Sequence, residues 1–227
     1  MLIAIDTSTD IASLALARDG RIIAELTWRC GQNHTVELYP ALDFLLKKSG
    51  LDIRCAQSVV VAIGPGSFNG LRVGVSAAKG LAFSLQIPLV GISTLEAAAY
   101  EHAETGWPVC AVQNAGRDEI AVAVYQKKPR QGWTRLSAEH LTTPATLAVE
   151  LKERTIFCGE FEASTAAQFK RLFKSRAVIP PPAGQLRRAA FLAELGRCRL
   201  EDGICDDAAS LQPIYLRRPP ITERKKP

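Results

Sequence analysis

The sequence is poor in the features that mark several large classes of protein. No apolar run approaches the roughly 18–20 residues that cross a bilayer, so the chain has no candidate membrane span. The first residues, Met1 to Asp6, include no basic stretch, and no signal peptide is expected. The six cysteines form no CxxC pair, which disfavours a zinc site and a disulfide framework. Cys110 and Cys158 lie in strand-like runs and are expected to be buried, and the expected compartment is a reducing cytoplasm.

Positive charge is present but concentrated at one end of the chain. The formal net charge is +5, with 28 basic and 23 acidic residues among 227. Residues 217–227 hold five of the basic residues and one of the acids, so the rest of the chain is almost neutral. A body this close to neutrality does not indicate a nucleic-acid-binding platform. Residues 219–227 are expected to form a flexible basic tail that is able to touch phosphates.

The most distinctive stretch is Ile63 to Gly74, which reads IGPGSFNGLRVG. The β-branched run from Ser58 to Ile63 predicts a buried strand, and Gly64-Pro65-Gly66 predicts a sharp turn. A helix capped by Ser67 or Asn69 is expected to follow. A glycine turn before a helix is a potential anion site, because free N–H groups converge there. The stretch lacks the Lys-Ser or Lys-Thr pair of a P-loop, however.

The predicted helix carries small residues at nearly every turn, namely Gly70, Gly74, Ala78 and Gly80. Each helical glycine costs about 0.8–1 kcal/mol relative to alanine, so the three glycines predict a closely approaching backbone. Two neighbours are compatible with this pattern. One is the sheet of the same domain, and the other is a helix of another chain.

The hydrophobic pattern predicts two similar halves, residues 1–104 and 105–218. In the first half, the expected strands are 2–5, 11–17, 21–28, 58–63 and 88–92, and the expected helices are 33–48, 67–85 and 94–104. In the second half, the expected strands are 109–113, 119–125, 133–136, 155–158 and 177–179, and the expected helices are 143–153, 163–174 and 186–200. Pro40 is expected to start or kink the first helix, and residues 213–217 are expected to be extended.

Two successive β-β-β-α-β-α-β units are the topology of actin-like phosphotransferases and sugar kinases. The predicted fold is therefore α/β and actin-like, of the ASKHA class, with two ribonuclease-H-like halves. In this architecture the turns after the first strand of each half face one another across a cleft. Here those turns are residues 6–9 and 114–117.

Several stretches together resemble the TsaB (YeaZ) family. They are residues 4–9 (AIDTST), 34–38 (HTVEL), 64–74 (GPGSFNGLRVG), 78–82 (AKGLA), 93–96 (STLE) and 213–217 (PIYLR). The likeness is dense over the first half of the chain and thin beyond it. Asn69 stands where the family usually has threonine, and Asn114 stands where it more often has aspartate.

The resemblance implies a scaffold or activator subunit without strong catalytic activity of its own. It implies pairing with TsaD, joined by the ATPase TsaE, for threonylcarbamoylation of the adenosine beside the anticodon in ANN-decoding tRNAs. The tRNA would be met through the complex, and a homodimer is the alternative when TsaD is missing. ATP and a metal are expected on the partners, no cofactor is expected on this chain, and no membrane partner is implied.

The resemblance and the small-residue pattern together predict two sets of site residues. The expected partner interface consists of Tyr39, Leu42, Leu46, Gly70, Gly74 and Ala78. The candidates for an anion site in the cleft are Asp6, Thr7, Ser8, Gly66 and Ser67.

The rival function is an autonomous enzyme, either an actin-like ATPase or kinase or a metallopeptidase-like hydrolase. A kinase is disfavoured because Asp6 has no evident second carboxylate and residues 114–117 offer no glycine run to cradle phosphate. A metallopeptidase is disfavoured because Leu38 follows His34 at the spacing where the TsaD metal site has a second histidine.

Three polar residues are therefore expected to have structural roles. His34 is expected to form a cap or an ordinary hydrogen bond rather than to bind a metal. Asp6 is expected to cap a turn. Arg117 is expected to pair with Asp118 or Glu119.

Overall fold

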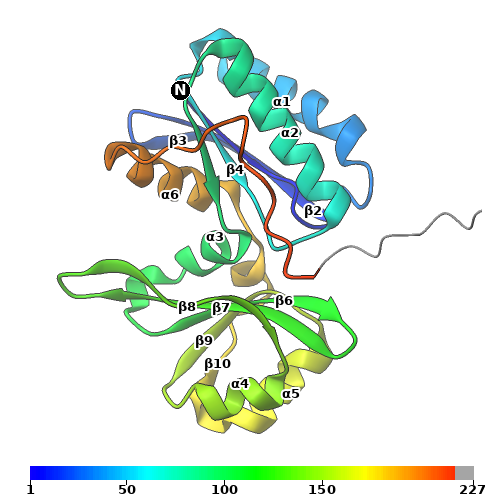
Figure 1. Cartoon of the computed structure of the whole chain (residues 1–227), viewed down its shortest axis with the longest axis vertical. Coiled ribbons are helices and arrows are strands. Elements are labelled where there is room, and N and C mark those ends of the chain that lie inside the picture. Colours follow the sequence, from blue (N-terminus) through cyan, green and yellow to red (C-terminus); the bar gives the residue numbers. More distant parts are fainter. Residues whose placement is uncertain (218–227) are drawn as a thin grey trace, which may run out of the picture.

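The computed structural model describes residues 1–217, which form two five-stranded sheets (Figure 1). The predicted tail at residues 219–227 lies outside the described residues. The first sheet has the order β3-β2-β1-β4-β5. Its strands are β1 (Leu2–Asp6), β2 (Ile11–Arg18), β3 (Arg21–Arg29), β4 (Ser58–Ala62) and β5 (Leu89–Ile92). β1 pairs antiparallel with β2 and parallel with β4, so the sheet is mixed.

The second sheet repeats this arrangement with the order β10-β9-β6-β7-β8. Its strands are β6 (Val109–Gly116), β7 (Glu119–Lys128), β8 (Gly132–Thr142), β9 (Thr155–Glu160) and β10 (Ala177–Val178). β6 takes the place of β1, because it pairs antiparallel with β7 and parallel with β9. The two halves therefore share one topology, as the order of elements predicts.

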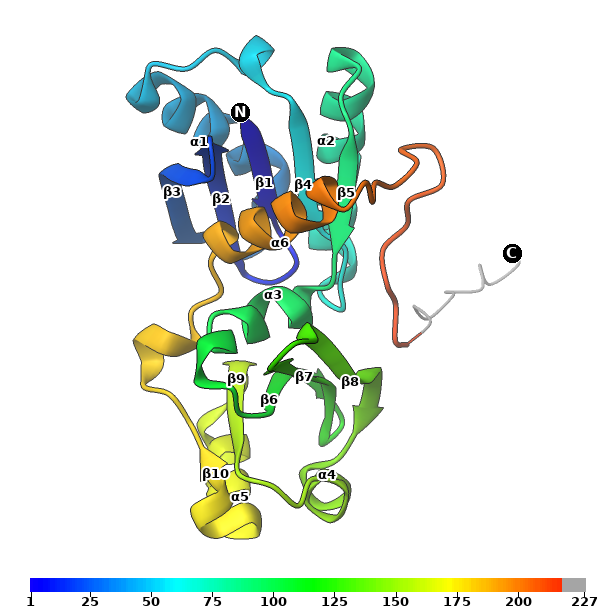
Figure 2. The same cartoon turned by 90° about the vertical axis from the view of Figure 1, so that its left-hand side faces the viewer.

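The helices form three layers with the two sheets between them (Figures 1 and 2). α1 (His34–Ser49) and α2 (Phe68–Leu85) cover the outer face of the first sheet. α4 (Pro144–Glu150) and α5 (Ala163–Phe173) cover the outer face of the second sheet. α3 (Thr94–Tyr100) and α6 (Ala189–Glu201) lie between the two sheets. In residues 1–217 no helix combines the length and the apolar character needed to cross a membrane.

Strand β1 shows why both faces of the first sheet are buried. Its side chains alternate, so that Ile3 and Ile5 pack with α1 and α2, while Leu2 and Ala4 pack in the cluster that includes α6. All five of its residues are buried. The loop after β1 is thereby held at the centre of the molecule.

Each of the two middle helices packs on the sheet formed by the other half of the sequence. α3 belongs to the first half of the sequence but packs on β6, β7 and β9 of the second sheet, through Leu95 and Ala99. α6 belongs to the second half but packs on β1 and β2, and its Gly196 lies against Val60 of β4. The division expected at residue 105 separates the two sheets, whereas each middle helix lies on the sheet of the other half.

Among the elements whose bounds differ from the sequence-based expectations, three differences have a clear physical cause. α1 begins at His34 and includes Pro40, so the expected start at that proline is wrong. Pro40 cannot donate to the carbonyl of Val36, but both residues are exposed, so water is able to satisfy that oxygen. β8 is longer than expected because it pairs along the length of β7. α6 begins at Ala189 rather than Leu186, because Arg187 enters the space between the sheets.

Candidate functional site in the cleft between the sheets

The turn after β1 is fastened to the start of α2. Asp6, Thr7 and Ser8 are all buried. The Ser8 N–H and hydroxyl donate to Asp6 Oδ1 at 2.9 and 2.6 Å, which confirms that Asp6 caps the turn. The Thr7 hydroxyl donates to the Gly70 carbonyl at 2.7 Å, and the Ser67 N–H donates to the Ser8 carbonyl at 2.6 Å. The polar groups of this turn are therefore used within the domain.

The glycines of the distinctive stretch make room for this turn. A Cβ atom on Gly66 would collide with the Ser8 carbonyl, and one on Gly70 would collide with the Thr7 carbonyl. A Cβ atom on Gly74 would collide with the Thr7 hydroxyl. The backbone that approaches α2 is thus the turn after β1 of the same chain. The expectation that Gly70 and Gly74 contact another chain is wrong, because the space beside them is already filled.

The rest of the expected interface divides between core and surface. Leu42, Leu46 and Ala78 belong to the core between the outer helices and the first sheet, so they are not available to a partner. Tyr39 is exposed on α1. The prediction for the three buried residues is wrong, because their side chains point towards the sheet rather than away from it.

A buried arginine joins the turn after β1 to the second sheet. Arg187 Nε donates to Asp6 Oδ2, and its Nη1 donates to Glu160 Oε1 at 2.5 Å. Its Nη2 donates to the Thr9 hydroxyl at 3.0 Å and to the Ile11 carbonyl at 3.2 Å. The Thr9 hydroxyl in turn lies 2.9 Å from Glu160 Oε1. Arg187 and Asp6 are almost inaccessible to solvent, and Glu160 is partly exposed.

This arginine stays charged in spite of its burial. Burial alone lowers the pKa of the Arg187 guanidinium, but Asp6 and Glu160 outweigh that effect and raise the pKa above its ordinary value. The two carboxylates in turn have a cation beside them. The cluster is an ion network inside the protein rather than an open site.

The turn after β6 is a plain hairpin. Residues 114–117 run from the end of β6 into a two-residue turn of Arg117 and Asp118, which have φ angles of 56° and 59°. This pair of left-handed residues is the geometry of a tight β-hairpin and not of a phosphate-binding loop. The expected pairing of Arg117 with Asp118 or Glu119 is wrong, because Arg117 forms no ion pair within residues 1–217 and Glu119 pairs with Arg217.

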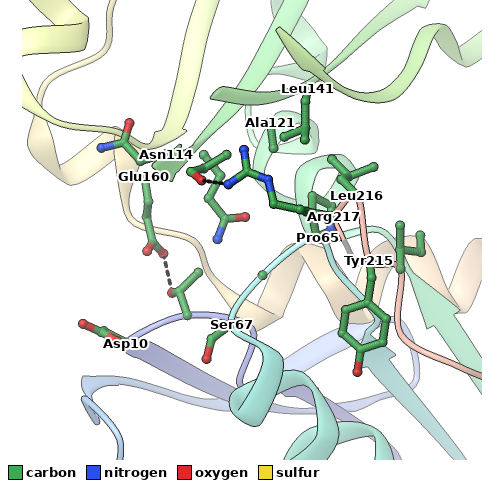
Figure 3. A pocket seen from close by; sticks show the side chains of 15 residues that line it. Asp10, Pro65, Ser67, Asn114, Ala121, Leu141, Glu160, Tyr215, Leu216 and Arg217 are labelled. Atoms are coloured by element: carbon green, nitrogen blue, oxygen red, sulfur yellow. Dashed lines mark hydrogen bonds between the residues drawn. The ribbon is translucent and has the colours of Figure 1, made fainter. Parts of the chain in front are cut away.

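A cavity of about 460 Å³ lies between the two turns (Figure 3). Its lining includes Asp10 and Ser67 from the first half and Asn114 and Glu160 from the second, so the two turns do face one another across a cleft. The segment that ends in Arg217 forms one wall, and the Arg217 guanidinium donates to the Ala115 carbonyl at 3.2 Å.

Two of the predicted anion-site residues line this cavity. They are Gly66 and Ser67, which lie at the N-terminus of α2. Asp6, Thr7 and Ser8 are buried below the cavity and do not line it. The prediction for these three residues is wrong, because their polar atoms are engaged with Arg187, Gly70 and one another.

A magnesium ion of the kind used by phosphotransferases does not fit beside Asp6. Glu160 supplies the second carboxylate that sequence reasoning missed, but Arg187 holds an oxygen of each acid. Among residues 1–217 no three His, Cys, Asp or Glu side chains are grouped as metal ligands. His34 Nε2 lies 2.8 Å from the Thr9 carbonyl and forms a hydrogen bond there, as expected.

Arg187 and Glu160 carried no signal in the sequence. Arg187 lies in the segment Gln185 to Arg188 (QLRR) before α6, where its charge resembles that of a solvated helix start. Glu160 ends a short strand. Asp6 and Arg187 are 181 residues apart, so only the packing of α6 on the first sheet brings them together.

Comparison with known proteins agrees with this architecture. Residues 27–177 match the family described as TsaD, tRNA N6-adenosine threonylcarbamoyltransferase. The chain is 36% identical to the tRNA threonylcarbamoyladenosine biosynthesis protein TsaB of Bacillus subtilis, over 95% of this chain and 93% of that protein. The structure of YeaZ from Pseudomonas aeruginosa superposes with a TM-score of 0.78 at 26% identity, covering 95% of this chain and 99% of the other.

A more distant likeness, of the fold alone, extends to a hexokinase. The ROK hexokinase of Thermus thermophilus superposes with a TM-score of 0.51 at 11% identity, covering 89% of this chain and 99% of that one. Fold and cleft thus define an actin-like protein whose cleft acid is paired with its own arginine. Within that class, the chain belongs to the TsaB family.

Proposed function

We propose that this chain is the TsaB-type subunit of tRNA threonylcarbamoyladenosine biosynthesis and acts as a non-catalytic partner of TsaD. The observation that carries the proposal is the 36% identity to a TsaB over 95% of the chain. The match of residues 27–177 to the TsaD family supports pairing between two proteins of related fold. In this proposal TsaE joins the pair, and the modified base is the adenosine beside the anticodon of ANN-decoding tRNAs.

The chemistry of the cleft supports the non-catalytic role. Phosphoryl transfer needs cations placed at the phosphates, and Asp6 is engaged with Arg187 instead of being free to hold one. The turn at residues 114–117 offers no phosphate cradle. We therefore assign ATP and metal chemistry to the partner subunits. The same two observations weigh against an autonomous kinase.

The outer face of α1 and α2 is the surface we assign to the partner. Phe83 is 76% exposed, Val36 is 69% exposed, and Tyr39 and Phe44 are each about half exposed. Large exposed apolar side chains gathered on two neighbouring helices favour a protein interface. Gly80 also faces outwards, and a Cβ atom there would meet nothing within 4 Å. Unlike Gly74, Gly80 therefore leaves room for a second backbone to approach.

Reconstitution tests the proposal directly. The purified chain is incubated with tRNA, ATP, threonine-derived substrate and either no partner or TsaD with TsaE, and the modified nucleoside is measured by mass spectrometry. We expect modification only with the partners, and no ATP hydrolysis by the chain alone. Turnover by the lone chain that persists after inactivation of any co-purified TsaD would overturn the proposal.

A second experiment tests the assigned surface. Gly80→Leu places a side chain where two backbones approach, which costs roughly 1–3 kcal/mol or about 5- to 150-fold in affinity for TsaD. The thermal midpoint of the chain alone is expected to stay the same or rise, because leucine favours a helix more than glycine. Gln168→Leu on the exposed side of α5 is the matched control. Equal affinities of the two variants for TsaD would place the interface elsewhere.

A further inference from the structure

Two carboxylates from different sheets converge on the buried Arg187. Asp6 ends β1 of the first sheet, and Glu160 ends β9 of the second. The Thr9 hydroxyl, which lies 2.9 Å from Glu160, completes a set of hard oxygen groups. The buried charge of Asp6 needs a cation close by, and hard oxygen atoms such as those of these three side chains suit a divalent ion. In this chain the cation is part of the polypeptide.

The Arg187 guanidinium fills the position between the two acids. Its Nε and Nη2 face Asp6, and its Nη1 faces Glu160 at 2.5 Å. The remaining contacts of Nη2 are with the Thr9 hydroxyl and the Ile11 carbonyl, at 3.0 and 3.2 Å. Each guanidinium nitrogen thus has a partner from the protein. Such complete use of a planar, forked donor fixes the orientation of the groups around it.

The position of Arg187 in the chain gives this cluster a mechanical role. The residue lies on the segment that leaves β10 of the second sheet and enters α6 on the first. We infer that Arg187 is a resident cation that clamps the two sheets together, in a position between Asp6 and Glu160 that would otherwise take a divalent ion. The inference goes beyond the proposed function and does not depend on any partner of the chain.

A neighbouring arginine provides a matched control. Arg188 pairs with Glu25 of β3 at 2.5 Å, and it is about half exposed. That pair joins the start of α6 to the first sheet and does not reach the second. Replacing Arg188 therefore removes an ion pair of similar length from the same segment while leaving the connection between the sheets intact.

Hydrogen exchange of the full chain tests the clamp. Arg187→Met and Glu160→Gln are expected to speed amide exchange at residues 7–11 and 182–188 by roughly tenfold or more, because the sheets separate locally. The amides of β4 and β7, which are interior strands of the two sheets, are expected to exchange as in the wild type. Arg188→Met is expected to leave residues 7–11 unchanged.

The outcomes are distinct. If Arg187→Met does not yield folded protein, Glu160→Gln decides, because it keeps the contact between Arg187 and Asp6 and changes only the contact with the second sheet. Exchange at residues 7–11 that is unchanged in a folded Arg187→Met, or in Glu160→Gln, would overturn the clamp.

Metal uptake tests the second half of the inference. Electron paramagnetic resonance is used to titrate Mn²⁺ into the wild type, into Arg187→Ala and into the double variant Asp6→Asn, Arg187→Ala. We expect Arg187→Ala to bind one Mn²⁺ that the wild type does not bind, and the double variant to lose it. A folded Arg187→Ala that binds no more Mn²⁺ than the wild type would show that the guanidinium does not occupy a cation position.

Discussion

The turns after β1 and after β6 hold equivalent places in two sheets of the same topology, yet their contacts differ. In the first turn, Asp6, Thr7, Ser8 and Thr9 are buried and bonded to α2, to Arg187 and to Glu160. In the second turn, the equivalent residues continue β6 into a hairpin, with exposed Arg117 and Asp118 at its tip.

The difference shows which of the two turns contributes to the packing of the core. The first turn forms part of the packing between β1 and α2, so a change there disturbs the core. The second turn connects two strands, and Glu119 beside it pairs with Arg217 of the C-terminal segment. One turn is therefore structural and the other is a connection.

The sharpest test of this comparison is Gly74→Leu. The side chain would enter the space held by Thr7, so we expect a loss of about 3 kcal/mol or more in the free energy of unfolding, at the upper end of overpacking costs. Denaturant titration of the soluble variant, or failure to recover it, measures the effect. Gly80→Leu, on the outer side of the same helix, is the control. Equal stability of the two variants would contradict the packing described for α2.

A smaller loss is expected from Thr7→Val. The substitution keeps the shape of the side chain but removes the donor to the Gly70 carbonyl, which costs about 1–2 kcal/mol at a buried site. Thr134→Val in β8, whose hydroxyl is exposed, is expected to cost less than about 0.5 kcal/mol. Chemical denaturation of both variants measures the difference. A larger loss for Thr134→Val would reverse the contrast between the two sheets.

The Cys30 thiol reports on the first turn through pH. The backbone N–H of Cys30 donates to the carbonyl of Asp10, which directly follows the first turn, at 2.8 Å. Burial, followed by the charge of Glu37, raises the pKa of the thiol from 9.0 to about 11. A raised pKa gives stability that is complete below about pH 9 and is lost as the pH rises towards 11.

The measurement is the free energy of unfolding between pH 8 and about 11 for the wild type and Cys30→Ala. We expect a steeper decline in the wild type, because the variant has no thiolate to bury. Other groups titrate in this range in both proteins, so only the difference between the two curves is informative. Parallel curves would mean that the thiol is not buried beside the turn.

The smallest effect is expected in the second turn. Asp118→Gly replaces a left-handed residue, with φ of 59°, by the residue that favours this conformation. The free energy of unfolding is expected to rise by up to about 1 kcal/mol. Calorimetry of the variant measures it. A fall in stability would show that the Asp118 side chain has a role in the cleft.

Sequence patterns predicted much of the fold because the signals are local. The strands expected at residues 11–17 and 21–28 are β2 and β3, and Ser67 caps α2 by accepting from the Gly70 N–H. Pro40 was the exception within a local pattern, because its exposure makes the lost hydrogen bond inexpensive. The candidate site was predicted less well. The sequence predicted the turn at residues 6–9, but it did not predict that Arg187 and Glu160 contact this turn.

The sequence by itself determined the order of strands and helices, the duplicated topology and the need for a close neighbour beside Gly70 and Gly74. These properties follow from hydrophobic periods and from backbone conformations, which act over a few residues. Only the tertiary structure decided that this neighbour is Thr7, and that Arg187 lies between Asp6 and Glu160. Those contacts join residues far apart in the chain. They form because α6 packs on the first sheet, which places the Arg187 guanidinium between the carboxylates of Asp6 and Glu160.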